Sequence, residues 1–215
     1  FGSITMHGEG MSSASGALDG TPSGNIWDAF QAAADEPEAA PGGAGGLSYA
    51  FPSMMDGLAV DLGYTPSGST EFEGSVELGL TYTGVDGLTL AVGTGNTATG
   101  GTAEVDSTTY GAKYATGGFT FGLQLTDVTT NGSTEEEDGI HYGVTYNVND
   151  DFTVGYVRQE TDFSGNSSDE EHSGVQASYS MGSISFSGRV SKVDGMGGTA
   201  SASDEDKHIT MSIAF

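Results

Sequence analysis

The chain has 215 residues, including 36 glycines and no cysteine, and its 30 acidic residues against 5 basic ones give a formal net charge of −25. This acidity excludes nucleic-acid binding, which needs a basic surface, and the absence of cysteine excludes disulfides and thiolate metal sites. No run approaches the roughly 18 apolar residues of a transmembrane helix. A membrane barrel remains possible, because it carries its signal in alternation rather than in long apolar runs.

Alternation of apolar and polar residues predicts an all-β chain of about twelve antiparallel strands. The first strand is expected within residues 1–9, where Ile4 and Met6 share one parity. The segment 10–45 has no such alternation, and Asn25 in its middle can cap a short helix. Alternation resumes at Leu47 and continues to the last strand, 208–215, which ends on Phe215.

The connections between the predicted strands alternate in length. Short turns are expected at about 52–57, 84–87, 115–118, 147–151 and 181–182. Long polar loops are expected between them, among them 65–73, 94–102, two acidic loops around 135–138 and 162–171, and 194–206. Because antiparallel strands place alternate connections at opposite ends, one end of the sheet is expected to carry the short turns and the other end the long loops.

Aromatic residues flank the short turns and keep the parity of the apolar face. A girdle of this kind is expected where amphipathic rings settle at a membrane interface. Its members are Phe51, Tyr82, Tyr114, Phe119, Tyr146, Phe152, Tyr179, Phe186 and Phe215. The alternative is a soluble β-sandwich, whose inner face would also alternate, but its outer face would carry Lys and Glu. Here the polar face is mostly Gly, Ser and Thr, which favours the lining of a lumen.

The opening Phe1-Gly2-Ser3-Ile4-Thr5-Met6, the long acidic segment after it and the final aromatic strand together resemble the general bacterial outer-membrane porins. Within that family, the chain is most similar to the alphaproteobacterial, Rhodobacter-type trimeric porins. The resemblance implies a sixteen-stranded transmembrane antiparallel β-barrel, of which about twelve strands lie in residues 1–215 as one domain. About four strands are then expected before Phe1, although a self-contained twelve-stranded barrel is the alternative. The resemblance further implies a homotrimer in the bacterial outer membrane, in contact with its lipid.

In such porins, an inward-folded loop narrows the pore, and the segment 10–45 stands where this constriction loop belongs. Its acids are candidate constriction residues facing the pore: Asp19, Asp28, Asp35, Glu36 and Glu38. Parity on the predicted strands adds five candidate residues of the pore wall: Asp61, Glu77, Lys113, His141 and Arg189. Together these charges would create a transverse field that orients solutes and sets ion preference. The alternative for each residue is a solvated charge without a selective role.

No cofactor is expected. The acidic runs Glu135, Glu136, Glu137 and Asp138, Asp169–Glu171 and Asp204–Asp206 could bind Ca²⁺ or Mg²⁺, which prefer carboxylate oxygens, but no known loop spacing is present. The alternative is a solvated acidic surface. Catalysis is not expected, because His7, His141, His172 and His208 lie apart and no motif places a nucleophile beside any of them.

The sequence therefore predicts a porin: a water-filled channel for passive diffusion of small hydrophilic solutes and ions, with a mild cation preference because the chain is acidic. Two alternatives stay open. One is a structural or adhesive outer-membrane barrel with a closed lumen, and the other is a soluble acidic β-protein.

Overall fold

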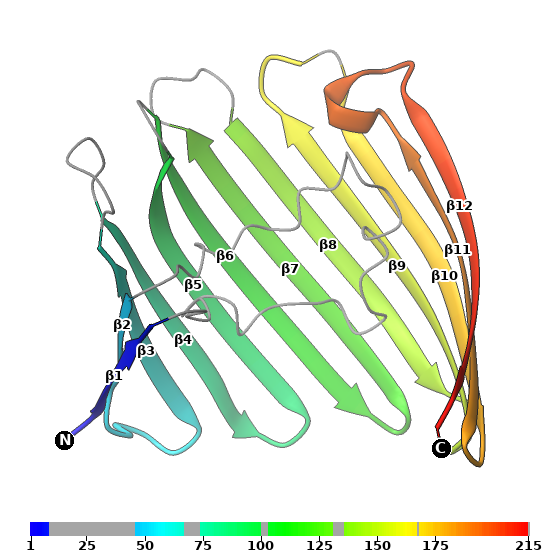
Figure 1. The fold of residues 1–215 in the computed structure, drawn as a ribbon, viewed down its shortest axis with the longest axis horizontal. Coiled ribbons are helices and arrows are strands. Elements are labelled where there is room, and N and C mark those ends of the chain that lie inside the picture. The colour runs from blue at the N-terminus through cyan, green and yellow to red at the C-terminus, as the bar shows by residue number, and fades with distance from the viewer. Residues whose placement is uncertain (9–45, 67–73, 100–102, 131–135, 167, 215) are drawn as a thin grey trace. The chain divides into compact units, whose positions relative to one another are not determined.

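The computed structural model describes residues 1–8, 46–66, 74–99, 103–130, 136–166 and 168–214. In this part of the chain, twelve strands form a sheet in which each strand is hydrogen-bonded to its neighbour in chain order (Figure 1). The strands are β1 (Ser3–His7), β2 (Gly46–Ala50), β3 (Leu58–Thr65), β4 (Ser75–Val85), β5 (Leu88–Thr99), β6 (Ala103–Thr116), β7 (Phe119–Thr130), β8 (Glu136–Asn147), β9 (Phe152–Phe163), β10 (Glu170–Met181), β11 (Ile184–Asp194) and β12 (Ser203–Ile213). A short 3-10 turn, η3 (Met196–Gly198), lies between β11 and β12.

The chain divides into two compact units. The first contains β1 to β5, most of β6, and one end each of β7 and β8. The second contains the remaining parts of β6, β7 and β8 and all of β9 to β12. Within the first unit β1 to β5 pair antiparallel in sequence, and within the second unit β9 to β12 do the same.

The predicted short turns are confirmed. Two-residue turns join β4 to β5, β6 to β7 and β10 to β11, and each contains a glycine with positive φ. At the β6–β7 turn both central residues, Gly117 and Gly118, have positive φ, +54° and +86°. This conformation matches the right-handed twist of the two strands it joins, and only glycine adopts it without steric cost.

The apolar and polar residues lie on opposite faces, as alternation predicts, but their exposure is the reverse of that in a soluble protein. Among the described residues, the only fully buried hydrophobic side chains of the core are Val157 and Val193. Large apolar side chains such as Ile209 (85% exposed) lie on the surface. Soluble proteins bury such residues and expose polar ones, so this apolar face needs an apolar surrounding. No helix in the described ranges is long and apolar enough to span a membrane.

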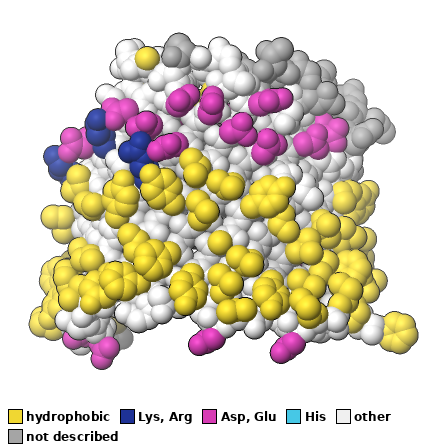
Figure 2. Space-filling view, turned by 180° about the vertical axis from the view of Figure 1, so that it is seen from behind, with side chains coloured by type: hydrophobic (Ala, Val, Ile, Leu, Met, Phe, Trp, Pro, Cys, Tyr) yellow, Lys and Arg dark blue, Asp and Glu magenta, His cyan; other side chains and the backbone are white. Residues whose placement is uncertain are grey.

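Register in the second unit defines rungs, meaning residues directly opposite one another on neighbouring strands. On the apolar face, one rung joins Val154, Ala177, Gly188 and Ile209. The next rung toward the short turns joins Phe152, Tyr179, Phe186 and Met211. Figure 2 shows apolar side chains of this kind gathered on the surface.

Charged residues occupy the same outward face of β9 to β12 beyond the apolar rungs. Arg158 pairs with Glu160 at 2.6 Å and with Glu171 at 3.0 Å. Lys192 pairs with Asp194, and Lys207 pairs with Glu205, at 2.5 and 2.6 Å. Dark blue and magenta side chains lie beside the yellow ones in Figure 2. Exposed ion pairs such as these each stabilise a fold by only about 0–1 kcal/mol, so they contribute little to strand pairing. Their position marks where the apolar surface ends.

Four of the predicted long loops are shorter than expected, because parts of them lie in strands. The segment predicted as a loop over 94–102 is largely strand, because β5 runs to Thr99 and β6 begins at Ala103. Threonine is β-branched and suits a pleated strand. Polar side chains also bind across the strands: Asn96 Oδ1 accepts from the Val76 amide at 2.8 Å, and the Thr94 hydroxyl donates to the Ser107 carbonyl at 3.2 Å.

The acidic segments expected as loops are also partly strand. Glu136–Asp138 open β8, Asp162 lies in β9, Glu170 and Glu171 open β10, and Asp204–Asp206 lie in β12. In β10 and β12 the strand continues because its neighbour supplies backbone partners: Glu171 opposes Asp194, and Asp204 and Asp206 oppose Val193 and Ser191. Local acidity therefore does not end a strand whose partner continues.

Replacement of neighbouring residues tests the assignment of the two faces. Ala177 faces outward on β10 and Ser178 faces the polar side. If the outward face meets lipid, Ala177→Arg should destabilise the folded protein by about 2–4 kcal/mol, the cost of an arginine near the bilayer midplane. Ser178→Arg should cost much less. Urea unfolding of both variants in lipid vesicles measures the difference, and equal losses would contradict the assignment.

Candidate functional site on the polar face

Seven predicted site residues lie outside the described residues. They are the five constriction acids Asp19, Asp28, Asp35, Glu36 and Glu38, together with Glu135 and Phe215. The short helix expected near Asn25 and the predicted constriction loop, 10–45, also lie there. These parts of the sequence-based interpretation stay predictions.

In the first unit, the polar face carries Asp61 on β3 and Glu77 on β4. Glu77 is 3% exposed, and Asp61 is half-buried. Gly63 stands opposite Glu77, and a Cβ added to it would come within 2.5 Å of Glu77 Cγ. The Glu77 side chain therefore lies across the backbone of β3, where only glycine leaves room for it.

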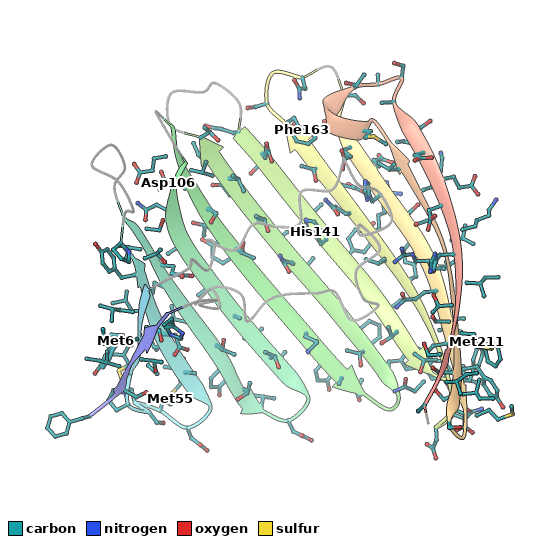
Figure 3. All side chains as sticks on the ribbon, viewed as in Figure 1. Met6, Met55, Asp106, His141, Phe163 and Met211 are labelled. Carbon is teal, nitrogen blue, oxygen red and sulfur yellow. The ribbon has the colours of Figure 1, made fainter. Side chains whose placement is uncertain are left out.

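The second unit contains the other three predicted wall residues. Lys113 on β6 is exposed, Arg189 on β11 is half-buried, and His141 on β8 is 2% exposed. His141 and Met211, both labelled in Figure 3, mark the polar and the apolar face. The Nε atom of Arg189 lies 3.5 Å from Oδ2 of Asp206 on β12. Arg189 also lines a hollow in this unit.

A buried polar cluster occupies the same face toward the long connections. His172 Nε2 lies 3.1 Å from Glu170 Oε1, and both side chains are at most 1% exposed. Beside them, the Gln159 amide donates to the Thr161 hydroxyl at 3.2 Å. Buried polar groups are costly unless they are hydrogen-bonded, so this cluster needs its partners in place.

Glu170 also holds the connection between β11 and β12. Its Oε2 accepts a hydrogen bond from the Gly197 amide of η3 at 2.7 Å. The connection closes on itself, because the Met196 amide donates to the Ala202 carbonyl at 3.1 Å. Gly195, with φ +71°, lies so close to the Asp169 carbonyl that a Cβ there would be 2.0 Å from its oxygen. One buried carboxylate thus fixes a long connection against the wall.

Two polar rungs form an open hollow next to this cluster. The hollow has a volume of about 280 Å³ and lies over β9 to β12. One rung joins Gly155, Gln176, Arg189 and His208, and the other joins Thr153, Ser178, Ser187 and Thr210. Most of the side chains on these two rungs can donate a hydrogen bond: Arg and Gln through N–H groups, Ser and Thr through hydroxyls, and His through a ring nitrogen.

The predicted aromatic girdle residues other than Phe215 lie on the apolar face at the short turns. In the second unit, Phe119 stacks on Tyr146 with ring centroids 4.3 Å apart, and Phe152 meets Tyr179 edge to face at 6.4 Å. Phe186 is opposite Tyr179. In the first unit, Phe51 packs against Tyr49 at 4.7 Å. Such pairs suit an interfacial role, which stays a prediction.

The described residues contain no group of three or more His, Asp or Glu side chains arranged to hold a metal ion. Glu136, Glu137 and Asp138, proposed as Ca²⁺ or Mg²⁺ ligands, lie on consecutive positions of β8. Consecutive strand residues point to opposite faces, which separates Glu137 from its two neighbours.

Sequence reasoning missed the cluster formed by Gln159, Glu170 and His172 and the partners of Arg189 in the hollow, Gln176 and His208. Parity alone places each of them on the polar face. What the sequence does not show is register, because a shift of two residues would keep parity and change every cross-strand neighbour.

Glu170 and Glu171 make a matched pair for testing the cluster. Glu170→Ala should destabilise the folded protein by about 3–5 kcal/mol, because it removes the buried carboxylate that pairs with buried His172 and accepts from the Gly197 amide. Glu171→Ala removes an exposed carboxylate and should cost about 0–1 kcal/mol. Urea unfolding and protease sensitivity of the 195–202 connection measure both. Similar losses for the two variants would show that Glu170 does not anchor this connection.

The fold of this chain is similar to the folds of solved outer-membrane proteins. OmpT of Vibrio cholerae, an outer membrane protein folded in vitro, is 16% identical with a TM-score of 0.66, over 98% of this chain and 73% of that one. An anion-selective porin from Comamonas acidovorans is 18% identical with a TM-score of 0.65, over 80% of this chain and 60% of that one. A porin refined at 1.8 Å resolution is 17% identical with a TM-score of 0.73, over 100% of this chain and 78% of that one.

Identities this low show the fold alone, and they confirm the predicted class, an all-β antiparallel barrel of the porin type. No curated protein sequence matches this chain. The profile of the Gram-negative porins matches residues 2–185. The exposed apolar face and this match place the protein in the bacterial outer membrane, so the soluble alternative is wrong. The chain belongs to the Gram-negative porin family.

Proposed function

We propose that this protein forms a water-filled channel for passive diffusion of small hydrophilic solutes and ions. The observation that carries the proposal is the polar face of the strands. It is lined with small polar residues such as Thr153, Ser178 and Ser187, while the opposite face is apolar. A barrel with lipid outside and water inside requires this division.

The proposed channel prefers cations mildly. The chain carries a net charge of −25, and a lumen enriched in carboxylates raises the local concentration of cations. The five acids Asp19, Asp28, Asp35, Glu36 and Glu38 are proposed to narrow and charge the pore as part of a constriction loop, 10–45. Asp61 and Glu77 on the wall support the same preference.

The finer assignments rest on resemblance. A homotrimer is proposed because OmpT of Vibrio cholerae is also known in a trimer form. A Rhodobacter-type subfamily is proposed on the opening Phe1–Met6 and the terminal aromatic strand.

The function is proposed to be non-enzymatic, and the acids around Glu136 remain proposed Ca²⁺ or Mg²⁺ ligands. The second candidate, an adhesive barrel with a closed lumen, predicts no conductance.

Ion selectivity tests the proposal directly. The full natural protein, purified from outer membranes and inserted into a planar lipid bilayer, should give stable conductance steps. In a tenfold KCl gradient, the reversal potential should shift toward the equilibrium potential of potassium. Its magnitude should stay well below about 59 mV, the limit for a channel that passes only one monovalent ion. A shift of the opposite sign would refute the cation preference, and silent membranes would favour the closed barrel.

Amide replacement of the five constriction acids tests their role. Asp19→Asn, Asp28→Asn, Asp35→Asn, Glu36→Gln and Glu38→Gln combined should move the reversal potential at least halfway to zero, because they remove five negative charges from the narrowest part. A matched control replaces Glu160 and Glu171, which lie on the outward face, and should leave the potential unchanged. If the control variant shifted the reversal potential as much as the five-residue variant, the cation preference would come from the overall charge of the protein and not from the constriction acids.

A further inference from the structure

Three of the five basic residues of this acidic chain lie on the outward face of the second unit, where the apolar surface ends. They are Arg158 on β9, Lys192 on β11 and Lys207 on β12. Arg158 and Lys192 stand on one rung, both opposite Ser173 of β10. Lys207 stands one rung nearer the short turns, opposite Val190. These three cations form the basic layer of the outward face.

On each of the three strands, the base and its acidic partner are two residues apart, and the acid is farther from the short turns. The partners are, in the same order, Glu160, Asp194 and Glu205. Glu171 of β10 adds a fourth carboxylate on the rung of Glu160 and Asp194. These four carboxylates form an acidic layer beyond the basic layer, and charged side chains lie above the yellow surface in Figure 2.

The side chains of both layers keep much of their surface exposed. The exposed fraction runs from 30% for Arg158 to 69% for Lys207 in the basic layer, and from 42% for Glu160 to 52% for Glu171 in the acidic layer. Exposed ion pairs are weak. An ammonium group has three donors and a carboxylate about four acceptor positions, so both layers can bind a further charged group while their own pairs stay in place.

An apolar groove lies on the same outward face, on the short-turn side of the basic layer. Its volume is about 770 Å³, and Lys207 of the basic layer is among its lining residues. The groove crosses the rung in which the small residues Ala177 and Gly188 stand between Val154 and Ile209. Within lipid, apolar groups gain stability from close van der Waals contact. An acyl chain that fits this groove is therefore held more firmly than one against a flat wall.

We propose that this surface binds a zwitterionic phospholipid, with its phosphate at the basic layer, its ammonium group at the acidic layer and an acyl chain in the groove. A basic layer alone would suit any anionic headgroup. The acidic layer beyond it repels a headgroup that carries only negative charge and attracts an ammonium group. Residues two apart on a strand are separated by about 7 Å, a span that an ethanolamine phosphate bridges with the help of the long Lys and Glu side chains.

Native mass spectrometry of the full natural protein in detergent tests the order of the two layers. At equal concentrations, phosphatidylethanolamine should stay bound at least fivefold more than phosphatidylglycerol, which has the phosphate but no ammonium group. One variant exchanges base and acid on two strands: Lys192→Asp, Asp194→Lys, Glu205→Lys and Lys207→Glu. It keeps the net charge and both ion pairs, and it should bring the ratio below twofold.

The control for this reversal is Lys113→Gln on the predicted pore wall, which should leave the ratio of the two lipids unchanged. The proposal is overturned if the natural protein binds both lipids equally, or if the preference survives the reversal. Stronger binding of lipid A, whose headgroup carries phosphates and no ammonium group, would overturn it too. Because the site faces outward, none of these measurements depends on conduction through the lumen.

Gly188→Leu tests the groove separately from the charges. A Cβ at Gly188 would be 3.8 Å from its nearest neighbour, the His208 carbonyl oxygen, so the wall accommodates a side chain there and the leucine fills the groove. This variant should retain phosphatidylethanolamine at least threefold less than the natural protein. Unchanged retention contradicts the groove as the acyl site. A dimer mass without lipid that Gly188→Leu removes would assign the groove to a second copy of the chain and overturn the proposal.

Discussion

The backbone of a strand inside a membrane has one source of hydrogen-bond partners, the neighbouring strand, because lipid offers none. This constraint explains why β9 to β12 pair in unbroken register from Glu171 to Met181 and on to Ile213. Beyond the apolar rungs, strands extend through acidic segments such as Ser203–Lys207 because the neighbouring strand supplies backbone partners there as well. Once the ladder is continuous, alternation sends every second side chain to lipid and the others to the lumen.

The two faces of the second unit are built by different interactions. The apolar face has almost no enclosed core, so its side chains gain their stabilisation from the surrounding lipid. The polar face is stabilised by specific partners: Glu170 binds both His172 and the Gly197 amide. The buried cluster fixes the long connection, and next to it the wall opens into the hollow around Arg189. A rigid anchored region thus adjoins a solvent-accessible one on the same four strands.

The errors of the sequence-based interpretation have one cause. The segments 94–102 and 194–206 were expected as loops because glycine, threonine, serine and aspartate are common in turns. In the structure, Thr94 and Asn96 bind neighbouring strands, and Asp204 and Asp206 continue β12 opposite β11. Composition reports the local preference of a residue, and pairing with an extended neighbour overrides that preference.

The sequence by itself determined the two-faced strands and the short turns at glycines such as Gly87 and Gly182, because period-2 alternation and positive-φ turns are local properties. The porin class came from the resemblance of its opening and terminal segments to a known family. The alternation also placed Arg189, Glu77 and His141 on the polar face. Only the tertiary structure decided which residues meet. Register set Arg189 beside His208 and Gln176, and folding of the β11–β12 connection buried Glu170 under η3. Those contacts join residues on different strands, and no local pattern records the alignment between them.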